Sequence, residues 1–172
     1  MGSLQEFNVK PVPTAATGTD FMAVAAFQQK TSELSRLISG AKREIERARE
    51  RQRHMKAALL ETAKATPALF RRLDELEVKL AGLQTRLSGD RVRQRMNEST
   101  VPSISSRVGR VAGGHWNTRQ TPTDTQKRNI EIAQNDFGKF RRDLVAYFND
   151  LSQYEATLEV AGAPWTPGRK LK

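Results

Sequence analysis

Residues 124–161, DTQKRNIEIAQNDFGKFRRDLVAYFNDLSQYEATLEVA, carry the most regular pattern in this 172-residue chain. Apolar side chains recur there in alternating three- and four-residue steps, at Ile130, Ala133, Phe137, Phe140, Leu144, Tyr147, Leu151, Tyr154, Leu158 and Ala161. This spacing lines one face of a helix and is typical of helices that pack side by side. Thr123 and Gln126 form a capping-box pattern before it, and Gly162 follows it. The sequence therefore predicts a long helix over residues 124–161.

Two earlier segments repeat the same spacing. The first, over residues 20–64, has its apolar positions at Val24, Phe27, Leu34, Ile38, Ala41, Ile45, Ala48, Met55 and Leu59, with Thr31 and Gln52 as interruptions. The second has Leu69, Leu73, Leu76, Leu80, Leu83 and Leu87 at the same steps. Thr66 and Pro67 suit the N-cap and the first residue of this second helix. The two helices are joined by a short turn, which makes them antiparallel.

The segment between the second and the last long helix is less regular. Asp90 follows a Ser-Gly break and can cap a short helical continuation to Met96. Ser103 predicts the start of another short helix, which Gly113-Gly114 is expected to end.

Three long apolar stripes need one shared core. The predicted fold class is all-α: an elongated antiparallel up-down-up three-helix bundle with heptad seams, plus a short extra helix and a short N-terminal extended arm. The second long helix and the short helix together are expected to return along the first. A parallel coiled-coil oligomer is the alternative, which the short connections disfavour. The expected division is an arm over residues 1–18, a bundle over 19–163 and a basic Pro/Trp tail over 164–172.

The arm has two parts. Its first three residues, Met-Gly-Ser, resemble a cloning remnant. Phe7 and Val9 then alternate with polar residues, and we interpret them as the end of a strand that belongs to an upstream β-domain.

The composition limits the function classes. The net charge is +10, 37% of the residues are hydrophobic and cysteine is absent. The positive charge suits anionic partners such as nucleic acid, acidic glycans or membrane surfaces without choosing among them. The lack of cysteine excludes a disulfide framework, a thiol nucleophile and a cysteine-based zinc site. No stretch approaches the roughly 20 apolar residues that span a bilayer, and the N-terminus lacks the apolar core of a signal peptide.

Residue types that carry chemistry are sparse. Only two histidines occur; His54 lies on a polar helix face, and His115 follows a glycine pair without a serine or carboxylate partner nearby in sequence. The glycines around it lack the Lys and Ser/Thr of a phosphate-binding P-loop, and no Glu-x-x-His motif of a di-metal bundle occurs. The sequence therefore predicts a non-enzymatic chain with no catalytic, metal-binding or cofactor-binding residue and no cofactor.

The candidates for partner contact lie outside the long seams. They are Arg91, Arg93, Arg95, Arg107, Arg110, His115, Trp116 and Trp165. The arginines occupy a stretch with little acid, which also contains Arg119, and can hold phosphate or carboxylate groups. Trp116 is expected to fold back as a lid on the bundle, whereas Trp165 suits a lid and a docking contact equally well.

The loop segments also carry a family resemblance. The run LSGDRVRQRMNESTVPSISSRVGRVAGGHW over residues 87–116, the TPT at 121–123 and the closing AGAPWTPGR over 161–169 resemble the C-terminal region of large bacterial β-propeller proteins. These proteins have sialidase-like Asp-box, or sortilin-type, repeats and are often labelled glycosyl hydrolases. The resemblance extends from about Phe7 to the end of the chain. It implies an upstream propeller and a small β-domain, an exported bacterial protein, and no hydrolytic residue within this chain.

Together these observations predict a non-catalytic C-terminal structural or interaction module of such a propeller protein. Its expected partners are the upstream domains of the parent chain or another protein, and the chain is expected to be a monomer or dimer without a membrane span. The alternative is a basic helical module that binds a polyanion, either nucleic acid or an acidic glycan. Polyanion affinity falls steeply with salt, whereas docking through a tryptophan does not, so ionic strength separates the two hypotheses.

Overall fold

The computed structural model describes residues 5–8, 19–118 and 120–169. These residues contain helices and no strand. The helices are α1 (Phe21–Leu60), α2 (Pro67–Ser88), α3 (Arg91–Arg95), α4 (Ile104–His115) and α5 (Asp124–Val160). The predicted all-α fold is confirmed.

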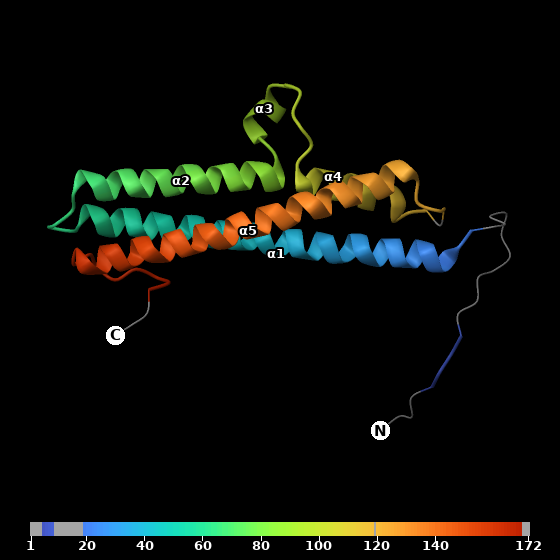
Figure 1. The fold of residues 1–172 in the computed structure, drawn as a ribbon, viewed down its shortest axis with the longest axis horizontal. Coiled ribbons are helices and arrows are strands. Elements are labelled where there is room, and N and C mark those ends of the chain that lie inside the picture. Colours follow the sequence, from blue (N-terminus) through green and yellow to red (C-terminus); the bar gives the residue numbers. More distant parts are fainter. Residues whose placement is uncertain (1–4, 9–18, 119, 170–172) are drawn as a thin grey trace.

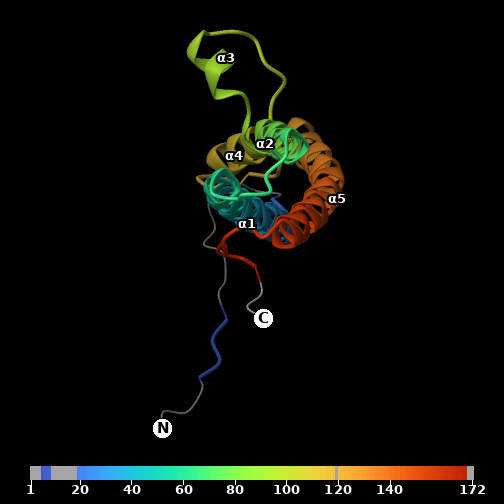
Figure 2. The same ribbon diagram turned by 90° about the vertical axis from the view of Figure 1, so that its left-hand side faces the viewer.

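The long helices form an elongated three-helix bundle (Figure 1). Helices α1 and α5 run the length of the molecule, and α2 and α4 lie end to end alongside both of them, in the opposite direction. The end-on view shows the bundle closed around one axis, with α3 standing away from it (Figure 2). The predicted up-down-up path, with the short helix continuing the second long one, is therefore confirmed. Among the described helices, none has both the length and the apolar character needed to cross a bilayer.

The core follows the predicted seams. The largest fully buried side chains are Tyr147, Phe140, Ile45, Met55, Leu59, Leu73, Leu76, Leu80, Leu87, Ile130, Leu151 and Leu158. The two polar interruptions of the first seam, Thr31 and Gln52, are also buried. Heptad spacing therefore continues through both positions, and the bundle includes two polar groups among its apolar contacts. Thr31 meets its own hydrogen-bonding need locally, because its hydroxyl donates to the carbonyl of Phe27 at 2.8 Å.

Helix ends match the sequence in three places. The Thr123–Gln126 capping box at the start of α5 is formed in both directions. Asp90 caps α3 by accepting from two backbone N–H groups, and Ser103 caps α4. Helix α1 ends at Leu60, four residues earlier than expected, and just beyond it the hydroxyl of Thr62 donates to the Ala58 carbonyl.

The predicted end of the short helix is wrong. Helix α4 continues through Gly113-Gly114 to His115. Each glycine costs about 1 kcal/mol relative to alanine inside a helix, and the burial of His115 in the next position supplies packing that offsets this cost. The predicted strand in the N-terminal arm lies partly outside the described residues; residues 5–8 have no strand, and Phe7 is exposed.

Candidate functional site

Helix α3 carries three of the predicted contact residues on a protruding segment. Arg91, Arg93 and Arg95 are all exposed, and the helix buries no residue. It packs against none of the other described helices and stands clear of the bundle between the ends of α2 and α4 (Figures 1 and 2). This segment, residues 89–103, is called the excursion below.

The predicted arginine cluster is not one surface. Arg107 is half-buried on α4, and its Nη1 donates to Asn129 Oδ1 on α5 at 3.0 Å. Its Nε is buried without a hydrogen-bond partner among the described residues, and the Nη1 contact makes Arg107 a link between α4 and α5. Arg110 is exposed on α4, and Arg119 lies outside the described residues.

His115 is a buried structural residue. Its Nε2 lies 3.1 Å from the carbonyl oxygen of Gln120, and its Nδ1 lies 3.5 Å from Nε2 of Gln28. Because a carbonyl only accepts, Nε2 carries the proton and Nδ1 accepts from the amide. Phe27 packs edge-on against the ring at 5.2 Å. Both ring nitrogens are thus used to join α1, α4 and the loop before α5, and none of these partners is a carboxylate or a hydroxyl nucleophile.

The expected role of Trp116 as a lid is wrong, because 58% of the residue is exposed. The reason is the unbroken course of α4. Successive helical residues differ by about 100° around the axis, so once His115 points inward, Trp116 points away from the core.

Trp165 belongs to a C-terminal clasp that the sequence did not reveal. The clasp is the segment 163–169, in which the ring Nε1 of Trp165 donates to the carbonyl of Arg169 at 3.3 Å. Arg169 in turn donates to the carbonyl of Pro164 at 2.7 Å and forms an ion pair with Glu159 at the end of α5. Thr166 is buried beneath this turn. The Pro-Trp-Thr-Pro-Gly-Arg motif therefore folds back against α1 and α5 near this end of the bundle, while 53% of Trp165 stays exposed.

The two tryptophans are far apart. Trp116 follows α4 at the end where α5 begins, and Trp165 follows the other end of α5. A 37-residue helix is about 55 Å long at 1.5 Å per residue. They belong to two separate surfaces.

A buried ion pair joins α1 to α5 beside the clasp. Nε and Nη2 of Arg51 lie 3.1 and 2.6 Å from the two carboxylate oxygens of Glu155. Only 8% of the Glu155 side chain is exposed. Gly168 of the clasp lies directly over Arg51: a Cβ at this position would be 2.8 Å from Arg51 Nε. The pair thus connects α1, α5 and the clasp.

Two buried tyrosines of α5 have shifted acidities. Burial raises the pKa of the Tyr154 hydroxyl to about 12, with a smaller contribution from the charge of Asp74. Burial also raises the pKa of Tyr147 well above its ordinary value, although the charge of Arg51 opposes this. Tyr154 donates to the Leu69 carbonyl at 3.1 Å. The Tyr147 hydroxyl and Gln52 Nε2 have no partner within hydrogen-bonding distance among the described residues.

These shifts predict that stability is lost at alkaline pH. In the unfolded chain a tyrosine ionises near pH 10, whereas the folded protein holds Tyr147 and Tyr154 neutral to a higher pH. Their contribution to the free energy of unfolding is complete below about pH 10. It is lost as the pH rises toward about 12, at about 1.4 kcal/mol per unit of pKa difference between the folded and unfolded states. Thermal unfolding followed by circular dichroism from about pH 8 to about pH 12, with phenolate absorbance recorded in parallel, checks this. The Y147F/Y154F variant should show a flatter decline; phenolates that form near pH 10 in a still-helical protein would contradict it.

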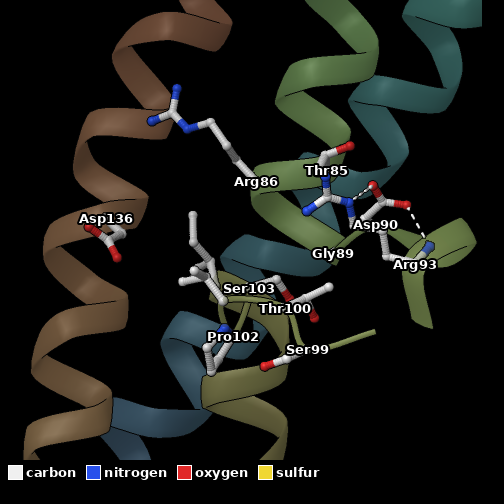
Figure 3. Close-up of a pocket in the computed structure, with 12 residues that line it drawn as sticks. Thr85, Arg86, Gly89, Asp90, Arg93, Ser99, Thr100, Pro102, Ser103 and Asp136 are labelled. Carbon is white, nitrogen blue, oxygen red and sulfur yellow. Dashed lines mark hydrogen bonds and ion pairs between the residues drawn. The ribbon is translucent and has the colours of Figure 1, made fainter. Parts of the chain in front are cut away.

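A concave surface lies at the base of the excursion. It is an open groove of about 620 Å³ between the end of α2, the excursion and α5. Figure 3 shows Arg86 and Asp136 on one side, Asp90 and Arg93 on the other, and Ser99, Thr100 and Pro102 along the excursion. Arg86 is paired with Asp143 of α5 at 2.5 Å. Among the described residues, no group of three or more histidine, aspartate or glutamate side chains is arranged to hold a metal ion.

Comparisons with protein-family models, with curated proteins and with solved structures find no match to this chain.

Proposed function

We propose that this chain is a non-catalytic structural and interaction module that lies C-terminal to a sialidase-like propeller. The observation that carries the proposal is the use of His115. It is the residue best placed in the sequence for catalysis, and its ring nitrogens are already occupied by Gln28 and Gln120 in a buried site. The features left to solvent are contact surfaces: the excursion, Trp116 at one end of the bundle and Trp165 at the other.

The docking role is tested by comparing the isolated bundle with a longer protein that includes the proposed propeller. In a longer protein with the propeller attached, the emission of Trp116 or Trp165 should shift to shorter wavelength relative to the isolated bundle, because docking removes water from an exposed indole. The shift should persist at high salt. Emission that is identical in both proteins would overturn the inter-domain role. Turnover of glycosidase substrates by the isolated bundle that is lost in H115N would overturn the non-catalytic role.

The charge distribution favours polyanion binding as the second candidate. The net charge is +10, and Arg36, Arg43 and Arg53 are exposed on α1 without an ion-pair partner among the described residues. Heparin and duplex DNA serve as probes. If polyanion binding is the function, the affinity of the chain for these probes should fall steeply between low and physiological salt, because binding releases counterions from the polyanion.

A further inference from the structure

The chain contains a single acceptor motif for N-linked glycosylation. This motif is an asparagine, then any residue except proline, then a serine or threonine. Among all the asparagines of the sequence, only Asn97 is followed by this pattern, in the run Asn97-Glu98-Ser99. The motif falls within the excursion, which is the segment that leaves the bundle between α2 and α4.

The fold leaves the motif accessible to an enzyme. Helix α3 ends just before it, and the excursion stands clear of the bundle (Figure 2). Asn97, Glu98 and Ser99 are all exposed. A transferase has to surround its acceptor side chain, and a segment that projects from a rigid scaffold gives it room that the face of a packed helix does not.

The two side chains that glycosylation needs are not used by the fold. Backbone bonds hold the turn, since the N–H of Asn97 donates to the Gln94 carbonyl at 3.3 Å and the N–H of Glu98 donates to the Arg93 carbonyl at 3.0 Å. The side-chain amide of Asn97 and the hydroxyl of Ser99 make no hydrogen bond to any described residue. Both groups are therefore available to an incoming enzyme.

The shape of the turn explains only half of the motif. Asn97 has a positive φ of 54°, and asparagine adopts this left-handed conformation more readily than most residues with a side chain. An asparagine at this position therefore has a structural reason as well. Ser99 has neither a positive φ nor a side-chain hydrogen bond within the described part of the chain, so the turn does not account for a hydroxyl two residues later.

Exposed apolar side chains flank the motif. Met96 precedes it with 68% of the residue exposed, and Val101 follows it with 84% exposed. Apolar side chains that face solvent together favour self-association. A glycan is bulky and hydrophilic, so one attached to Asn97 would shield these neighbours from other molecules.

We propose that Asn97 accepts an N-linked oligosaccharide from a lipid pyrophosphate donor when the chain is exported. The side-chain nitrogen of Asn97 forms a bond to the anomeric carbon of the first sugar. The bond from that carbon to the lipid pyrophosphate breaks, and the amide loses one proton. The Ser99 hydroxyl is recognised by the transferase and is not altered. This inference goes beyond the proposed function: it requires export, which the resemblance implies, but no partner domain.

Glycan transfer to the folded chain tests the proposal. The purified full chain is incubated with an oligosaccharyltransferase and its lipid-linked oligosaccharide, and the intact mass is measured. The mass should rise by one glycan, and an amidase that releases N-linked glycans should leave aspartate at position 97. N97Q and S99A should abolish the rise, whereas S99T should keep it because threonine also supplies a hydroxyl.

The variants are matched in structure. Because neither side chain makes a hydrogen bond within the described residues, N97Q, S99A and S99T should have the same circular dichroism spectrum as the unaltered chain. A loss of transfer in N97Q or S99A then reports on the motif and not on unfolding.

A peptide control makes the result decisive. A peptide that spans residues 93–103 is offered to the same enzyme. Transfer to the peptide but not to the folded chain would show that the turn hides the acceptor and would overturn the proposal. Absence of transfer to both, or equal transfer to S99A and the unaltered chain, would overturn it as well. The mass measurement does not depend on docking, so failure here leaves the tryptophan emission test unaffected.

Discussion

Replacement of Arg51 by alanine is expected to lower the free energy of unfolding by about 3–5 kcal/mol. The substitution leaves the Glu155 carboxylate, with 8% of its side chain exposed, buried without the two N–H groups that now contact it at 3.1 and 2.6 Å. An unpaired buried charge is much more costly than the loss of an exposed pair. Because 23% of the Arg51 side chain is exposed, water reaches part of the site, and the lower half of that range is expected. Chemical denaturation followed by circular dichroism measures the change.

The chain provides a matched control for this prediction. Arg47 forms an ion pair with Glu44 at 2.7 Å on the same helix, with 71% and 44% of the two side chains exposed. R47A should therefore cost at most about 1 kcal/mol. The double variant R51M/E155L, which replaces the pair by apolar side chains, should recover most of the lost stability. If R51A and R47A cost the same, the buried pair does not contribute as argued.

Phe140→Ala is expected to cost about 3–5 kcal/mol, as buried Phe-to-Ala changes do. Phe140 is fully buried and packs against Phe137 at a ring distance of 5.8 Å. Both rings lie at the level of the break between α2 and α4. Asp136, next to Phe137, lines the groove at this break, and Asp143, one turn after Phe140, pairs with Arg86 at the end of α2. The aromatic pair thus fills the core where α2 has ended and α4 has not begun. With a typical total stability of about 5–15 kcal/mol, this loss is a large share.

Denaturant midpoints of two further variants keep this prediction testable if F140A does not fold. F140L retains much of the buried volume and should cost clearly less than F140A. V145A, on the exposed face of α5, should change stability by no more than about 0.5 kcal/mol. If F140A and V145A lose similar amounts of stability, this aromatic pair does not stabilise the core at the break between α2 and α4.

Much of the fold could be predicted from the sequence because its determinants are local. A seam such as that of α5 repeats every three or four residues, the distance over which helical side chains share a face. Caps such as Thr123 with Gln126 act within one turn. Short connections then allow only antiparallel neighbours. The burial of Gln52 follows from the same periodicity, since its position falls on the seam whatever its polarity.

The candidate site was predicted less completely. The exposed arginines of α3 can be identified from their concentration in the sequence, but the groove that Arg93 lines cannot, because it is made by three segments that meet only in the folded bundle. The misplaced ring of Trp116 came from ending α4 at a glycine pair. Glycine weakens a helix without forbidding it, and the packing of His115 against Phe27, from another helix, decides that the helix continues.

The sequence by itself determined the helical class, the three seams and the antiparallel order, because helical periodicity and short turns are properties of neighbouring residues. Only the tertiary structure decided that Arg51 meets Glu155, 104 residues away, that the C-terminal motif closes as a clasp, and that residues 89–103 leave the bundle above a groove. These outcomes depend on the axial register of the helices against one another. That register is set by the packing of all the seams at once, and no local pattern contains it.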